Sequence, residues 1–207
     1  MSPDRRWWLR VPAVLVSPRS VFLALRDESR EEAEARAEPI LALVYLAGVA
    51  HALSTSTART LYDNAEYDPL LVAVWALIAG GFVAFVGYFV IGAAVYLGAL
   101  GLGSEGSFRR ARHVLAYALT PLALSLFVLW PVELALFGAD VFKRGGSDEG
   151  APRTVFEALA LGFALWAAAL LLIGVRAVHG WSWWRSLGAL GLVALFLAAY
   201  AYLPEVL

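Results

Sequence analysis

Residues 69–104 read PLLVAVWALIAGGFVAFVGYFVIGAAVYLGALGLGS, an uncharged run of 36 residues that lies between Asp68 and Glu105. A helix rises about 1.5 Å per residue, so this run could extend for about 54 Å, whereas the hydrocarbon core of a bilayer is about 30 Å thick. The run therefore predicts a membrane-spanning helix. Because it is longer than one crossing needs, we expect it to tilt, to bend at a glycine, or to end in a helical turn that projects from the membrane near residues 98–103.

The composition of the rest of the chain supports the same solvent. Of 207 residues, 61% are hydrophobic and 16% are charged, whereas soluble domains average about 45–50% apolar and about 25% charged residues. The net charge is −1, so nucleic-acid binding is not expected. The sequence has no cysteine, which excludes disulfides and thiolate metal sites.

Five apolar segments predict transmembrane helices, and they cover residues 39–55, 70–101, 114–137, 155–175 and 187–203. Helices are expected because a segment in lipid must satisfy its own backbone polar groups. The sequence therefore predicts an all-α polytopic integral membrane protein. We expect residues 1–38 to form a cytoplasmic segment and residues 39–207 to form a five-helix membrane domain.

Positively charged residues orient the predicted bundle. Seven Arg precede the first span, Arg109, Arg110 and Arg112 follow the second, and Arg176 and Arg185 follow the fourth. The positive-inside rule places these segments in the cytoplasm, with the N-terminus inside and the C-terminus outside. If residues 70–101 crossed twice, the arginine cluster after them would move outside, so one long crossing is favoured.

The segment before the first span predicts an interfacial amphipathic helix. Ser17 is suited to the N-cap and Pro18 to the first helical position. Val21, Phe22 and Leu25 follow at helical spacing and form an apolar stripe. We expect the helix to continue into a charged, solvated turn. It either seals the bundle as a plain anchor or serves as a docking platform for a cytoplasmic partner.

Two ionisable side chains, His51 and Glu133, fall inside the predicted spans. Ionisable groups in a membrane are functional candidates because burial without a partner is costly. Both lie toward the outer side, so one hypothesis is a buried, proton-sensitive pair. The alternatives are that Glu133 extends toward water and that His51 bonds to water or a backbone carbonyl. The Gly-rich loop at residues 145–150 favours a flexible, solvated connection.

Prolines and glycines mark sites of bending and close packing. Pro121 and Pro131 predict kinks in the third span, as packing features or as a mobile hinge. Small residues allow helix backbones to approach closely, within one chain or between two copies. The predicted helix-packing glycines are Gly80, Gly81, Gly87, Gly92 and Gly98.

Tryptophans beside arginines predict anchors at the headgroup level, and they are Trp7, Trp8, Trp181, Trp183 and Trp184. No His-Glu-x-x-His motif, phosphate-binding loop preceding Lys-Ser/Thr, or supported Ser, His and Asp set occurs. We therefore expect no enzyme activity, no metal and no cofactor.

Several short motifs occur in a familiar order, namely SPRSVF at residues 17–22, GSEGSF at 103–108, YALTP at 117–121, Trp166, and GVRAVHGWS at 174–182. Over residues 15–203 this arrangement resembles the Yip domain family (Ypt/Rab-interacting proteins), in its prokaryotic branch. The resemblance implies five membrane helices, a cytoplasmic N-terminus and residence in a prokaryotic cell membrane. In eukaryotic relatives it implies small-GTPase binding, vesicle traffic and association of family members, and it assigns GTPase binding to no residue here.

Two functions follow as hypotheses. The first is a non-enzymatic membrane scaffold or adaptor that organises protein partners or the bilayer. Its expected partners are the lipid bilayer and membrane or cytoplasmic proteins, with a homo-oligomer as a further alternative. The second is a small-solute or ion transporter or channel. It is motivated by His51, Glu133, the two prolines and the glycine-rich second span.

Overall fold

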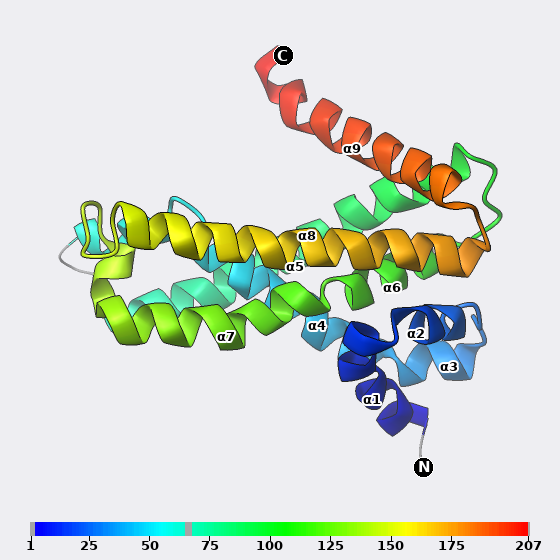
Figure 1. Cartoon of the computed structure of the whole chain (residues 1–207), viewed down its shortest axis with the longest axis horizontal. Helices are drawn as coiled ribbons and strands as arrows, with labels where there is room; N and C mark the ends of the chain where they lie inside the picture. Colours follow the sequence, from blue (N-terminus) through cyan, green and yellow to red (C-terminus); the bar gives the residue numbers. More distant parts are fainter. Residues whose placement is uncertain (1–2, 65–67, 207) are drawn as a thin grey trace. The chain divides into compact units, whose positions relative to one another are not determined.

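The computed structural model describes residues 3–64 and 68–206, and every regular element within them is helical (Figure 1). The elements are α1 (Pro3–Val16), α2 (Pro18–Ala24), α3 (Arg30–Ala35), α4 (Ala37–Leu53), η1 (Ala58–Asp63), α5 (Pro69–Leu100), α6 (Phe108–Ala118), α7 (Thr120–Phe137), η2 (Gly138–Phe142), α8 (Ala151–His179) and α9 (Trp183–Val206).

The chain divides into two compact units. Unit 1 combines the chain up to Leu41 with Val86–Ala118 and with everything from Ala168 onward. Unit 2 combines Ala42–Phe85 with Leu119–Ala167. Helices α4, α5 and α8 therefore each contribute residues to both units.

Four helical stretches in the described residues are long and apolar enough to cross a membrane, and they are Arg30–Leu53, Pro69–Leu100, Phe108–Phe142 and Ala151–His179. A shorter apolar helix covers Trp183–Ala199. The predicted all-α, polytopic membrane fold is confirmed. The expected five spans correspond to four full-length candidates and one shorter apolar helix.

The long apolar run forms one continuous helix. Helix α5 has 32 residues and ends at Leu100, which corresponds to about 48 Å of helix. The amide of Gly101 donates to the Leu97 carbonyl at 2.9 Å. Gly103 then adopts a φ of +78°, a left-handed conformation that glycine takes without steric cost. The chain thus leaves the helix where the last glycines of the run lie.

The predicted third span consists of two helices. Helix α6 ends at Ala118 and α7 begins at Thr120, with Pro121 in its first turn. A proline cannot donate a backbone hydrogen bond to the preceding turn, which accounts for the break at this point. Pro131 lies inside α7 without ending it.

Three of the five predicted helix-packing glycines contact another helix closely. A Cβ on Gly80 would lie 2.6 Å from Val49 Cα, so α4 and α5 pack backbone to backbone there. A Cβ on Gly98 would lie 2.6 Å from the Ala189 carbonyl oxygen of α9. A Cβ on Gly92 would lie 2.5 Å from the Arg112 side chain.

The remaining two predicted glycines are less restricted. Gly81 faces the Tyr45 ring at 3.2 Å. Gly87 meets only Ile91, a residue of its own helix, within 4 Å among the described residues. The sequence reading did not single out Gly48, where a Cβ would lie 2.4 Å from the Gly80 carbonyl oxygen.

The N-terminal segment contains more helix than its sequence predicts. Helix α1 was not expected, and α2 ends at Ala24 before α3 begins at Arg30. Ser17 is the N-cap of α2 with Pro18 in the first turn, but the Ser17 side chain makes no capping hydrogen bond. The apolar stripe of α2 is buried against protein: a Cβ on Gly174 of α8 would lie 2.9 Å from the Phe22 ring.

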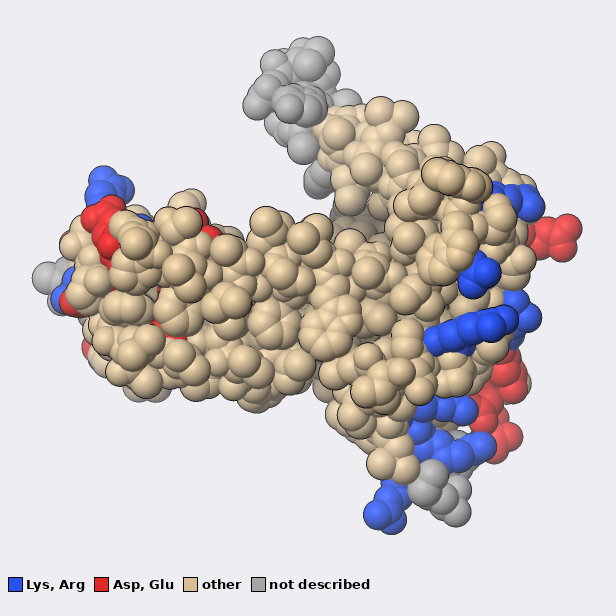
Figure 2. Space-filling view, in the orientation of Figure 1, with Lys and Arg blue, Asp and Glu red and all other residues tan. Residues whose placement is uncertain are grey.

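Large apolar side chains remain exposed on the spans. Examples are Phe82 at 70% exposure on α5, Leu136 at 64% on α7 and Leu165 at 62% on α8. In Figure 2, uncharged residues cover the visible side of α7, and the charged side chains of unit 2 gather at the end that carries η2 and the following loop. This pattern fits a surface that contacts lipid hydrocarbon along its length.

Candidate functional site

Two clusters of charged side chains stand out in the described residues, one in each unit. In unit 1, side chains of α1 and of the α2–α3 segment bind to α6 and to the end of α8. We call this set the N-terminal clasp, and its central residues are Trp7, Arg26, Glu28, Arg36 and His113. In unit 2, the Arg59 cluster comprises Arg59, Glu133, Asp148 and Arg153.

Arg36 is the most deeply buried cation of the clasp. Its side chain has no solvent exposure. The Nε atom donates to His113 Nδ1 at 2.8 Å, and one Nη donates to the Asp27 carbonyl at 2.7 Å. The other Nη is buried and finds no hydrogen-bond partner among the described residues. Because His113 accepts at Nδ1, its ring proton lies on Nε2 and the imidazole is neutral.

Trp7 lies in the interior beside this pair. It is fully buried, and its indole Nε1 donates to Glu32 Oε2 at 2.8 Å. Its ring centroid lies 5.7 Å from that of Tyr117, whose hydroxyl donates to the Trp7 carbonyl at 3.4 Å. The expectation that Trp7 anchors the chain among lipid headgroups is therefore corrected, because protein atoms enclose the ring. Trp8 is 43% exposed and donates to Glu38 Oε2 at 3.4 Å.

Glu28 connects the α2–α3 segment to α6. The Ser107 hydroxyl donates to Glu28 Oε1, and Arg110 Nη2 donates to Glu28 Oε2 at 2.9 Å. Arg109 also donates to the Glu28 carbonyl at 3.2 Å. Nearby, the Ser29 amide donates to Asp27 Oδ1 at 2.9 Å, and this bond lowers the pKa of the Asp27 carboxyl.

Arg26 connects the same segment to α8. Its guanidinium donates to the Ala177 carbonyl at 2.6 Å and to the Val178 carbonyl at 3.1 Å. These carbonyls lie in the last turn of α8, where backbone acceptors have no partner within the helix and a cation also complements the helix dipole. The α2–α3 segment is thus held on two helices through groups more than 75 residues away in sequence.

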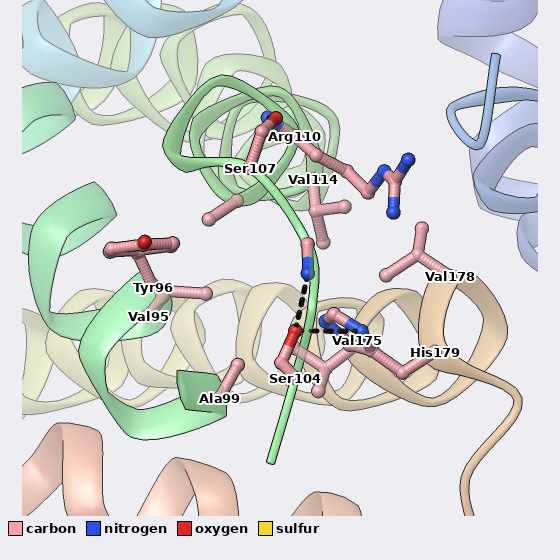
Figure 3. A pocket seen from close by; sticks show the side chains of 12 residues that line it. Val95, Tyr96, Ala99, Ser104, Ser107, Arg110, Val114, Val175, Val178 and His179 are labelled. Carbon is pink, nitrogen blue, oxygen red and sulfur yellow. Dashed lines mark hydrogen bonds between the residues drawn. The ribbon is translucent and has the colours of Figure 1, made fainter. Parts of the chain in front are cut away.

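A small cavity lies next to the clasp, between α5, α6 and α8 (Figure 3). The Gly106 amide donates to Ser104 Oγ at 2.9 Å, and that hydroxyl lies 3.2 Å from His179 Nδ1. Valines line much of the remaining wall. The cavity volume is about 10 Å³, which is enough for about one water and no organic substrate. The Ser104–His179 pair therefore joins the α5–α6 turn to the end of α8.

The short motifs noted in the sequence meet in this region. Phe22 from residues 17–22 packs under Gly174, where an added Cβ would also lie 2.7 Å from Val114. Ser104 comes from the motif at 103–108 and His179 from the motif at 174–182. Segments that are widely separated in sequence thus build one packed junction in unit 1.

The Yip1 domain family model matches residues 13–203. The chain belongs to the Yip1 domain family. Together with the apolar helices, this membership makes it an integral membrane protein that contacts the bilayer. No curated protein and no solved structure shows significant similarity to the Yip1-domain chain.

The Arg59 cluster of this Yip1 protein pairs its charges with carboxylates. Arg59 Nη1 lies 3.5 Å from Glu133 Oε1 and 3.3 Å from Asp148 Oδ2. Arg153 binds Asp148 with two bonds, Nε to Oδ2 at 3.0 Å and Nη2 to Oδ1 at 3.1 Å. Asp148 has no exposure, and Glu133 has 3%. Two cations and two anions therefore balance.

A cavity of about 270 Å³ opens beside this cluster. Its polar lining comes from Ser54, Arg59, Ser125, Glu133 and Glu157, and its apolar lining from Leu129, Trp130, Phe156 and Ala160.

The Gly-rich loop at residues 145–150 is more closely packed than its composition suggests. A Cβ on Gly146 would lie 2.1 Å from the Asp140 carbonyl oxygen.

His51 and Glu133 have different surroundings. Glu133 is buried and paired with Arg59, whereas His51 is exposed near the end of α4. No hydrogen bond or ion pair joins the two side chains in the described part of the chain. The structure brings Glu133 to Arg59, a residue that the sequence reading assigned to a loop.

The tryptophans that follow α8 differ in exposure. Trp181 is half-buried, with His179 stacked on its ring at 4.5 Å and Arg185 at 4.4 Å. Trp183 is 48% exposed and Trp184 is 83% exposed. The last two have the exposure that a headgroup contact requires.

Sequence reasoning missed Arg36 and His113, which lie at the centre of the N-terminal clasp. Arg36 and His113 lie just outside the apolar windows at residues 39–55 and 114–137, so neither was singled out as a buried group. An ionisable residue within one helical turn of an apolar run is the signal that could have identified both.

Proposed function

We propose that this Yip1-domain protein is a non-enzymatic membrane scaffold or adaptor that presents its N-terminal helices to protein partners. The observation that carries the proposal is the N-terminal clasp. Arg26, Glu28 and Arg36 bind α1–α3 to the membrane helices α6 and α8, which gives the segment a defined surface.

The exposed side of this segment has the composition of a protein-binding surface. Arg30 and Glu34 form an exposed pair at 2.7 Å, with side-chain exposures of 91% and 66%. Leu9 is 55% exposed and Val16 is 82% exposed. A preorganised surface of mixed charge with apolar side chains reduces the ordering cost when a partner binds. The arginine-rich loops support placing this surface in the cytoplasm.

Proximity labelling from a functional tagged copy in its native membrane tests the proposal. We expect a reproducible set of partner proteins for the wild type. The E28R variant should lose that set because it removes the anion that binds Arg110, and E28R/R110E should recover it in part by reversing the pair. Failure to recover any reproducible partner from the wild type would contradict the scaffold role.

Fusion of reporters to either end tests the proposed topology, with the N-terminus inside and the C-terminus outside.

The packing of the glycines limits which surfaces a homo-oligomer could use. Gly80 packs against Val49 and Gly98 packs against Ala189 of the same chain. An oligomer would therefore use other surfaces.

The cavity beside the Arg59 cluster supports transport of a small solute or ion as the second candidate. It combines Glu133 with Glu157 and two serines in a volume of about 270 Å³. Proteoliposomes containing the wild type and E133Q test this function with a pH-sensitive dye and with labelled cations. Flux that requires Glu133 would favour the transporter, and equal leakage from both samples and from empty vesicles would count against it.

A further inference from the structure

A second groove in unit 1 lies outside the clasp and outside the cavity of Figure 3. It runs between α2 and the last turns of α8 and extends to the first residue of α9, with a volume of about 590 Å³. Its polar lining is Ser17, Arg19, Ser20 and Arg176. Its apolar lining includes Leu23, Ile173, Ala177 and Trp183.

The charge of this groove has one sign. Two guanidinium groups line it, and none of the described residues that line it is acidic. Three acids of the N-terminal segment pair with arginines outside the groove: Glu28 binds Arg110, Glu32 binds Arg6 and Glu34 binds Arg30. Folding therefore separates charges that appear balanced along the sequence.

Polar groups in the groove also have unused capacity. Arg176 Nε is buried without a hydrogen-bond partner in the described part of the chain, and the guanidinium lies 4.5 Å from the Trp183 ring centroid. The Ser17 side chain makes no capping bond. The Ser20 hydroxyl donates to the Ser17 carbonyl at 2.8 Å. The two guanidinium groups and the Ser17 hydroxyl around one hollow suit the oxygens of a phosphate group.

The apolar wall identifies the source of that phosphate. Ile173 and Arg176 lie in the last two turns of α8, which is long and apolar enough to span a membrane. Trp183 is half-exposed beside them. A free phosphate would leave Leu23, Ile173 and Trp183 in water, whereas the glycerol and first methylenes of a lipid would cover them.

We infer that this groove binds the phosphate of an anionic glycerophospholipid, with Arg19 and Arg176 contacting the headgroup and Leu23, Ile173 and Trp183 contacting the upper acyl chain. This inference does not depend on the scaffold role, since a lipid site can exist with or without protein partners. It goes beyond general contact with the bilayer because it assigns one site and one lipid class.

Native mass spectrometry of the full chain in neutral detergent tests the inference, with equimolar phosphatidylglycerol and phosphatidylcholine added. We expect the wild type to retain phosphatidylglycerol about tenfold better, since each arginine near an anionic headgroup contributes severalfold. R19Q/R176Q should reduce this preference to near one. The matched control R30Q/R144Q removes the same charge from side chains that are 91% and 81% exposed, and it should keep the preference.

A second pair of variants keeps the test informative if R19Q/R176Q does not fold. Ser20 and Ser56 are both exposed, so S20D places a carboxylate in the groove and S56D places one in unit 2. Only S20D should abolish the preference. Three results would overturn the inference: no lipid preference in the wild type, a loss of preference in each control variant equal to that in its test variant, or complete displacement of the lipid by millimolar inorganic phosphate.

Discussion

In unit 2, Arg59 contacts two carboxylates, whereas in unit 1 the fully buried Arg36 contacts an imidazole nitrogen and a backbone carbonyl. Asp148 in turn binds a second arginine, so the unit 2 cluster is neutral as a group. The acceptors of Arg36 are neutral, and one of its Nη atoms lacks a partner among the described residues.

This difference separates two ways in which a membrane protein can hold a charge away from water. Removing one member of a balanced ion cluster leaves another charge uncompensated, which costs several kcal/mol. Removing a cation whose acceptors are neutral leaves only polar groups without a bond, which costs less. We therefore expect substitutions in the Arg59 cluster to lower stability more than substitutions in the N-terminal clasp.

The largest effect is expected from D148N. The variant leaves Arg59 and Arg153 facing a neutral amide, and it should lower the free energy of unfolding by about 3–5 kcal/mol. Thermal unfolding in a fixed detergent measures the loss. E149Q changes the exposed neighbouring acid and should have little effect; a similar loss in both variants would show that Asp148 is not a special site.

The comparison itself is tested by R59M and R36M. R59M strands Glu133 and should cost about 3 kcal/mol. R36M leaves only the His113 nitrogen and the Asp27 carbonyl without a donor, and it should cost about 1–2 kcal/mol. The same unfolding assay applies. If R36M were the more damaging variant, the distinction between paired and neutral surroundings would fail.

An intermediate effect is expected at His113. H113F leaves the Arg36 Nε without its acceptor and should cost about 2 kcal/mol, because the stranded donor is charged. H113Q retains an acceptor and should cost less. The fraction of each variant that remains folded in detergent, measured over a series of temperatures, distinguishes the variants. Equal losses of stability in H113F and H113Q would contradict a role for the hydrogen bond.

The smallest effect is expected from S104A. The substitution removes the acceptor of the Gly106 amide and the bond to His179, and it should cost about 1 kcal/mol. Hydrogen exchange of the α5–α6 turn should increase locally, while exchange in unit 2 should stay unchanged. Unaltered protection at residues 101–107 would show that the Ser104–His179 pair does not hold the turn.

Sequence predicted the helices whose signal is local. The uninterrupted apolar run predicted α5, and Pro121 predicted a kink at the point where the structure has a break between α6 and α7. Helix α1 was missed because Arg5, Arg6 and Arg10 interrupt its apolar pattern. Its Trp7 is buried by residues that follow much later in the chain.

The sites could not be predicted because their partners are far apart in sequence. Arg59 meets Asp148 across 89 positions, and Arg36 meets His113 across 77. No periodic pattern encodes such a pairing. The composition of the Gly-rich loop predicts a solvated Asp148, yet Arg59 and Arg153 both bind this carboxylate.

The central claim is that the N-terminal segment is held against α6, and cross-linking tests it directly. Since the chain has no cysteine, E28C/S107C and the control E31C/S107C can be treated with a short thiol-to-thiol reagent in intact membranes. Glu28 binds Ser107, whereas Glu31 is exposed on α3. Arg26 and Arg36 still hold the segment on α8 and α6 in E28C/S107C. The account therefore predicts a linked peptide pair only for E28C/S107C; linkage in neither variant, or equal linkage in both, would contradict it.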